Sequence, residues 1–164
     1  MEQLIETLRT QRDLSDKELI ALITRESDDK DLFAAADAVR REHYGTDVFL
    51  RGLIEFTNVC QNDCYYCGIR KSNAQAQRYR LTQEQILHSC ENGYRMGFRT
   101  FVLQGGEDPR NTDAWVCSMV DKIKTAHPDC AVTLSIGEQS RASYQAYFDA
   151  GADRYLLRHE TASE

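Results

Sequence analysis

Three cysteines stand close together in the sequence, Cys60, Cys64 and Cys67, with the spacing C-x3-C-x2-C. Three thiolates in so short a loop can converge on one metal centre, whereas iron–sulfur cubanes are usually held by four cysteines. A [4Fe-4S] cluster on three cysteines keeps an open position on one iron, as a catalytic metal requires. Such a site suits reductive cleavage of S-adenosylmethionine (SAM). The methionine amino and carboxylate groups bind the open iron, the sulfonium accepts an electron, and a 5′-deoxyadenosyl radical forms.

Two other interpretations of this loop stay open. A structural zinc site would need a fourth ligand such as Cys90 or His88, and zinc sites usually contain C-x2-C pairs. A set of buried thiols without metal is the other alternative, but residues 61–63 (Gln-Asn-Asp) make the loop polar for a core segment. The spacing and the aromatic residue before the third cysteine favour the cluster.

Composition bounds the protein class. The chain has 164 residues, which indicates one domain, and 41% of them are hydrophobic. Its net charge of -6 argues against a general nucleic-acid surface, which needs a basic stripe. We expect no membrane span and no secretory signal, hence a cytoplasmic protein. In that reducing compartment the six cysteines predict ligands or core thiols rather than disulfides.

The first 46 residues predict a helical segment. Ser15 and Glu18 form a capping box before apolar residues at helical spacing. A further helix is expected over residues 31–43, and Gly45 follows its end. None of these residues carries chemistry by itself.

Residues 47–164 show a different pattern, in which short apolar runs alternate with helical segments. Such alternation predicts βαβ units and a parallel sheet. The expected strands are 48–50 and 53–56, 100–103, 131–134 and 154–157. The expected helices begin at the Thr82–Gln85 capping box, at Asp113 as N-cap, and at Ser140, and Gly97, Pro128 and Gly151 follow their ends.

Polar residues follow each predicted strand. Right-handed crossovers place the carboxyl ends of parallel strands at one side of the sheet, where the chemistry of such folds lies. The residues in question are 57–67, 104–108, 135–138 and 158–161. Each of these exits has at least one carboxylate or cysteine, as the rim of an active site would.

Several longer motifs resemble the radical SAM superfamily and, within it, the HydE family of [FeFe]-hydrogenase maturases, a relative of biotin synthase and methylornithine synthase. Beyond the cysteine loop, the resemblance rests on segments spread from about residue 50 to the last residue. These segments are Ile54–Cys60, Cys64–Arg70, Arg78–Thr82, Leu103–Pro109, Leu134–Glu138 and Gly151–Ala162. The helical N-terminal residues fit that family more loosely.

The resemblance implies an α/β fold, the N-terminal half of a (β/α)8 radical SAM barrel, preceded by a helical extension. It implies cluster ligands at Cys60, Cys64 and Cys67, and it places Tyr66 near the adenine. The turn Gly105-Gly106-Glu107 would meet the methionine amino group. The remaining residues expected at SAM are Ser135, Arg158 and Glu160. The alternatives are surface carboxylates for Glu107 and Glu160 and an ordinary ion pair with Asp153 or Glu138 for Arg158.

The resemblance also implies a small-molecule substrate, with other hydrogenase maturases and an electron donor as partners. The alternatives are another biotin synthase-like enzyme, of the methylornithine synthase or biotin synthase type, and a non-catalytic zinc module. Family members form a full barrel of about 250 residues or more. Since this chain ends just after the fourth strand, we expect a fragment with an open sheet edge, poorly stable and weakly active alone.

Overall fold

The computed structural model describes residues 2–25 and 29–158. It divides the chain into two compact units, Met1–Phe49 and Leu50–Glu164. In the part of the chain that it describes, no helix combines the length and the apolar composition that crossing a bilayer requires.

The first unit consists of helices, as the sequence predicts. They are α1 (Glu2–Gln11), α2 (Asp16–Ile23) and α3 (Lys30–Tyr44). The predicted capping box at α2 is present, because the Ser15 amide donates to Glu18 Oε2 at 2.9 Å. Gly45 follows α3 with φ 62°, a backbone conformation that favours glycine. Ile5 and Leu22 are the buried apolar residues among those described in this unit.

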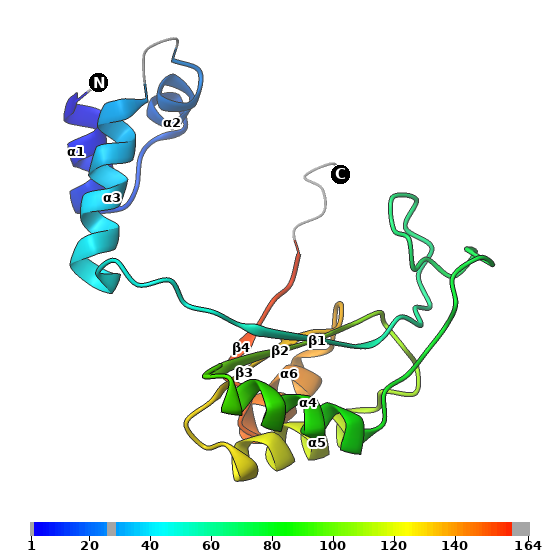
Figure 1. Cartoon of the computed structure of the whole chain (residues 1–164). Coiled ribbons are helices and arrows are strands. Elements are labelled where there is room, and N and C mark those ends of the chain that lie inside the picture. The colour runs from blue at the N-terminus through cyan, green and yellow to red at the C-terminus, as the bar shows by residue number, and fades with distance from the viewer. Residues whose placement is uncertain (1, 26–28, 159–164) are drawn as a thin grey trace. The chain divides into compact units, whose positions relative to one another are not determined.

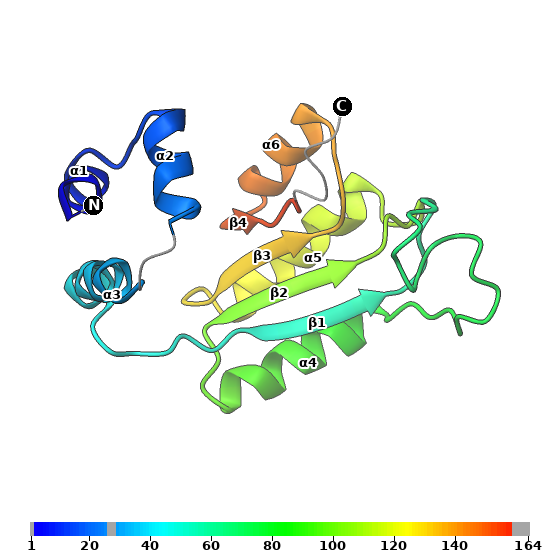
Figure 2. The same cartoon turned by 90° about the horizontal axis from the view of Figure 1, so that it is seen from above.

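The second unit is a four-stranded parallel sheet with helices between its strands, and it confirms the predicted α/β class. The strand order is β1-β2-β3-β4, and Figures 1 and 2 show α4, α5 and α6 on one side of the sheet. The elements are β1 (Gly52–Thr57), α4 (Gln83–Arg95), β2 (Thr100–Gly105), α5 (Asp113–Ala126), β3 (Ala131–Ser135), α6 (Arg141–Asp149) and β4 (Arg154–Tyr155).

The core lies between the sheet and these helices. In β1 Ile54 and Phe56 are buried while Leu53 and Glu55 are exposed, so the two faces of the strand alternate. Phe56 stacks on Trp115 of α5 with ring centroids 5.6 Å apart. Other core members are Ile86, Phe101, Leu103, Met119, Val120, Ile123, Val132, Leu134 and Tyr147. Apolar packing thus occupies the helix side, while the other face carries Glu55 and Gln104 near the strand ends together with the exposed Leu53.

Three local predictions differ from the structure. Residues 48–50 do not join the sheet, and β1 begins at Gly52, whose neighbour in the ladder is Phe101. β4 has two residues rather than four, since its ladder with β3 ends at Tyr155. The N-cap of α5 is Thr112 rather than Asp113, because the Thr112 hydroxyl accepts from the amide of Trp115.

Candidate functional site

A cavity of about 590 Å³ lies at the carboxyl ends of the four strands. It brings together residues from all four predicted exits. They include Cys60, Cys64, Tyr66 and Cys67 after β1, Gly105, Gly106 and Glu107 at β2, Ser135 after β3, and Arg158 after β4. Glu160 lies outside the described residues. Except for Glu160, the predicted site residues therefore share one cavity.

The three cysteines line this cavity from a loop without regular secondary structure. Cys60 and Cys67 are partly exposed and Cys64 is exposed, so all three thiols are accessible to an incoming metal. Within residues 2–25 and 29–158, no three Cys, His, Asp or Glu side chains are positioned as a ready metal site. The donor set of three cysteines on one cavity wall fits a [4Fe-4S] cluster with one open iron.

The fourth ligands named for a zinc site lie elsewhere. Cys90 is fully buried in the core on α4, and burial, with a smaller effect of the Cys130 thiol, raises the pKa of Cys90 to about 12. His88 also lies on α4, where its Nε2 contacts the side-chain amide of Asn92 at 3.0 Å. Neither residue lines the cavity, so neither one completes a zinc site with the cysteine loop.

Hydrogen bonds within the cysteine loop fix its course. The Cys67 amide donates to the Cys64 carbonyl at 3.0 Å, and the Lys71 amide donates to the Asn62 carbonyl at 2.8 Å. Asp63 Oδ1 accepts from the Ser72 amide at 2.9 Å. Hydrogen bonds from Ser72 lower the pKa of Asp63, so this carboxylate stays charged at neutral pH.

The turn after β2 touches the cysteine loop through its main chain. A Cβ on Gly106 would lie 2.4 Å from the Val59 carbonyl oxygen and 2.8 Å from Cys60 Cβ. A Cβ on Gly105 would lie 2.7 Å from Thr57 Cγ2. Two consecutive glycines therefore permit a close approach that places Cys60 beside the turn.

Glu107 connects the exits of β1 and β3. Its carbonyl accepts from the Gln61 amide at 2.9 Å, and its Oε2 accepts from Gln61 Nε2 at 3.4 Å. The carboxylate lies over Gly137, where a Cβ would meet Glu107 Oε1 at 2.3 Å. Since Gly137 also has φ 84°, that position favours glycine for two reasons. Glu107 thus presents a carboxylate to the cavity while its main chain holds the loop.

Asp108 anchors the same turn through an ion pair with Arg80, in which the carboxylate is buried and the guanidinium is not. Its side chain is fully buried and accepts from Arg80 Nε at 2.5 Å and from Nη2 at 3.1 Å. Thr57 Oγ1 lies 3.1 Å from Asp108 Oδ2. Burial raises the pKa of Asp108, but hydrogen bonds from Arg80, the Arg110 amide and Thr57 outweigh burial and hold that pKa below its ordinary value. The carboxylate is therefore charged at neutral pH.

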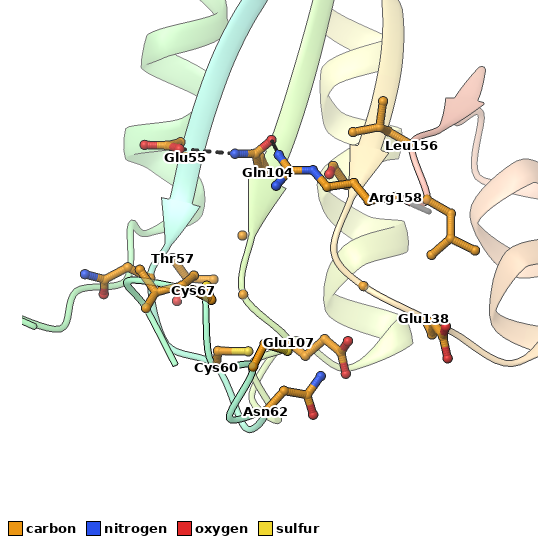
Figure 3. A pocket seen from close by; sticks show the side chains of 18 of the residues that line it. Glu55, Thr57, Cys60, Asn62, Cys67, Gln104, Glu107, Glu138, Leu156 and Arg158 are labelled. Atoms are coloured by element: carbon orange, nitrogen blue, oxygen red, sulfur yellow. Dashed lines mark hydrogen bonds between the residues drawn. The ribbon is translucent and has the colours of Figure 1, made fainter. Parts of the chain in front are cut away.

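A polar row crosses the open face of the sheet. Glu55, Gln104 and Ser135 are neighbours in the ladder. Gln104 Nε2 donates to Glu55 Oε1 at 3.1 Å, and Arg158 Nη2 donates to Gln104 Oε1 at 3.2 Å. Figure 3 shows Glu55, Gln104 and Arg158 side by side across the sheet, with Cys60 and Glu107 beyond the strand ends. The row supplies both signs of charge to the cavity wall.

Some cavity residues were missed by the sequence analysis. Glu55 belongs to the cavity because it alternates with buried Ile54 and Phe56, a period-2 signal that the sequence contains. Tyr79 reaches the cavity from a segment without secondary structure, and its hydroxyl donates to the Glu55 carbonyl at 2.9 Å. No sequence pattern indicates that contact.

Comparisons with known proteins agree with this geometry. A model of the radical SAM superfamily matches residues 54–164. The [FeFe] hydrogenase maturase subunit HydE of Thermotoga maritima is 46% identical over 132 residues, which are 80% of this chain and 37% of that protein. The 3-methylornithine synthase of Methanosarcina acetivorans is 32% identical over 153 residues, 90% of this chain and 43% of that protein.

Among solved structures, the crystal structure of methylornithine synthase (PylB) superposes with a TM-score of 0.83 and 29% identity. The match covers 98% of this chain and 48% of that one. The chain therefore spans less than half the length of each of these three relatives.

Proposed function

We propose, from the premise that this chain belongs to the radical SAM superfamily, that it forms the cluster-binding part of an enzyme that cleaves SAM reductively. In this proposal Cys60, Cys64 and Cys67 hold a [4Fe-4S] cluster. When bound, such a cluster supplies the electron that cleaves the SAM sulfonium and yields a 5′-deoxyadenosyl radical. The observation that carries the proposal is the convergence of three cysteines and the exits of four parallel strands on one cavity.

The other cavity residues would bind and orient SAM. The Glu107 carboxylate is placed to accept hydrogen bonds from an ammonium group, which a charge-assisted bond favours. Ser135, buried at the end of β3, offers a hydroxyl, and Arg158 offers a guanidinium for a carboxylate. Tyr66 would cover the adenine ring. Glu160 remains a proposed SAM contact from the resemblance alone.

The first experiment tests cluster and SAM binding. The chain is reconstituted anaerobically with iron and sulfide, reduced with dithionite, and followed by EPR with and without SAM. We expect a cubane signal that shifts when SAM is added, and formation of 5′-deoxyadenosine. Replacing Cys60, Cys64 or Cys67 by Ser should lower iron content at least about tenfold. Cys117→Ser, outside the cavity, is the matched control and should keep the iron. A colourless protein with one zinc and no response to SAM would refute the proposal.

For the whole protein we propose a role in maturation of the [FeFe]-hydrogenase, with a small-molecule substrate. Its support is the 46% identity to the Thermotoga maritima HydE, which is higher than the 32% to 3-methylornithine synthase. The full reading frame that encodes this chain should restore hydrogenase activity in a host that lacks its own HydE. No restoration, with the foreign protein present and loaded with iron, would reject this role.

The second candidate is an enzyme of the methylornithine synthase or biotin synthase type. The structural match to methylornithine synthase, with a TM-score of 0.83, is the observation in its favour. The cysteine loop is expected in all these groups and does not separate them. Genes beside the encoding frame separate them: hydrogenase maturases support the first role, and pyrrolysine or biotin genes support the second.

A further inference from the structure

One arginine outside the predicted site contacts the cysteine loop at four points. Arg78 Nη1 donates to the carbonyls of Asn58 at 2.6 Å and Ile69 at 2.8 Å. Arg78 Nη2 donates to the carbonyls of Arg70 at 2.6 Å and Asn73 at 3.3 Å. Asn58 precedes the three cysteines and the other acceptors follow them. One guanidinium therefore ties together the two ends of the segment that contains all three thiols.

These contacts depend on the shape of the side chain. The guanidinium is a planar fork with five N–H donors, and it loses little conformational freedom per hydrogen bond formed. A lysine ammonium carries the same charge at a single nitrogen and cannot occupy both branches of the fork. Although Arg78 is exposed to solvent, its four acceptors define one geometry, whereas a single exposed pair would contribute little.

Tyr79 and Arg80, which follow Arg78, contact strand β1, the residue after it and the turn after β2. The Tyr79 amide donates to Asn58 Oδ1 at 2.8 Å, and the Tyr79 hydroxyl donates to the Glu55 carbonyl. Arg80 pairs with buried Asp108 in the turn after β2 and forms an isolated antiparallel bridge with Thr57. Arg78 and Arg80 thus connect the loop on one side and the β2 turn on the other.

We propose that Arg78 is a positioning residue that shapes the cysteine loop in the metal-free chain, so that the three thiols stay on the cavity wall where a cluster is assembled. Residues 78–80 then form a strap between the cysteine loop and the β2 turn. The purpose assigned to the loop rests on the proposed function. The ordering of the loop by Arg78 does not, since it rests on the four hydrogen bonds from its guanidinium.

The test compares amide hydrogen exchange in the metal-free full chain and in two variants, Arg78→Lys and Arg78→Gln. Exchange in peptides covering residues 60–73 should rise about tenfold in both variants, while β2 and β3 keep their protection. Arg95→Lys is the matched control, because Arg95 pairs with Glu91 on the exposed face of α4, and it should leave loop exchange unchanged. Unchanged loop exchange in Arg78→Lys would overturn the proposal, since charge alone would then suffice.

A second measurement separates positioning from general stability. The melting temperature of the sheet unit should stay within a few degrees of that of the unchanged chain, while iron bound after anaerobic reconstitution falls about tenfold in Arg78→Lys. If the melting temperature of Arg78→Lys falls well beyond a few degrees along with its bound iron, the loss of iron reflects general instability, and the positioning role is overturned. If the unchanged chain itself takes up no cluster, the proposed function fails, and the exchange experiment still decides the role of Arg78.

Discussion

The cysteine loop and the turn after β2 meet at one cavity but differ in how closely their main chains are packed. The loop has no regular secondary structure, and side chains such as Arg78 and Asp63 hold it through hydrogen bonds to its main chain. The turn is shaped by close packing, with Gly106 buried against Val59. Hydrogen bonds tolerate small movements, whereas the packing at Gly106 leaves no room for a Cβ, which would lie 2.4 Å from the Val59 carbonyl oxygen. The turn therefore acts as the fixed reference against which the adaptable loop is placed.

The largest effect should come from Gly106→Ala, which disrupts the closely packed turn after β2. The added methyl would lie 2.4 Å from the Val59 carbonyl oxygen, a backbone atom that moves only if the loop moves. We expect a loss of about 3 kcal/mol in the free energy of unfolding and failure to bind iron. Urea denaturation measures the first effect and iron analysis the second.

Gly68→Ala is the matched control within the cysteine loop. A Cβ there meets nothing within 4 Å, so the free energy of unfolding should change by less than about 0.5 kcal/mol. Equal losses for both glycine variants would contradict the contrast between packed turn and tethered loop.

A smaller effect is expected from Asp108→Asn, which removes the charge that anchors the turn. Because Asp108 is buried and Arg80 is partly exposed, we expect a loss of about 2 kcal/mol at pH 7, less than for a fully buried pair. The pKa of Asp108 is lowered in the folded state, so the ionised carboxylate stabilises the protein above its unfolded pKa of about 3.9. That contribution is lost as the pH falls through the lower folded pKa.

The difference in unfolding free energy between the unchanged chain and Asp108→Asn should thus be constant from about pH 5 to 7 and shrink below about pH 4. Urea denaturation at several pH values measures it. Arg95→Gln, at an exposed pair on α4, should change stability by about 0.5 kcal/mol or less. A difference that grows on acidification would contradict the assigned charge of Asp108.

The smallest effect should come from Asn58→Ala, at the beginning of the tethered loop. Its side chain accepts from the Tyr79 amide at 2.8 Å and donates to the Gln77 carbonyl at 2.7 Å. Loss of both bonds should lower stability by about 1 kcal/mol and speed exchange of the Tyr79 amide. Asn92→Ala, at an exposed contact with His88, should cost about half as much or less. A loss as large as that of Gly106→Ala would show that the loop is as rigid as the turn.

The sheet unit was predictable because its signals are local. The capping box of Thr82 and Gln85 lies within one turn of helix, and both of its hydrogen bonds are present. Short apolar runs marked β2 and β3 correctly. The N-cap of α5 was misplaced by one residue, since Thr112 and Asp113 are both good caps. Asp113 instead accepts hydrogen bonds from the Tyr147 and Ser143 hydroxyls of α6, contacts that only the folded chain shows.

For the candidate site, too, the sequence predicted the location of the residues but not the contacts that hold them. The cysteine spacing and the strand exits indicated which residues meet at the cavity, because carboxyl ends of parallel strands lie together. The support around them was not predictable. Arg78 reaches four carbonyls on both sides of the cysteines and Arg80 reaches Asp108 in the next turn, and no period or spacing encodes such contacts. Positioning residues of this kind require the tertiary structure.

The stacked pair of Phe56 and Trp115 has a practical consequence. Trp115 is the single tryptophan of the chain, so intrinsic tryptophan emission comes from the sheet unit alone. The far-ultraviolet circular dichroism signal, in contrast, sums the helices of both units. A denaturation curve followed by both signals therefore shows whether residues 1–49 melt together with the cavity or separately, and the chain carries this optical reporter without any added label.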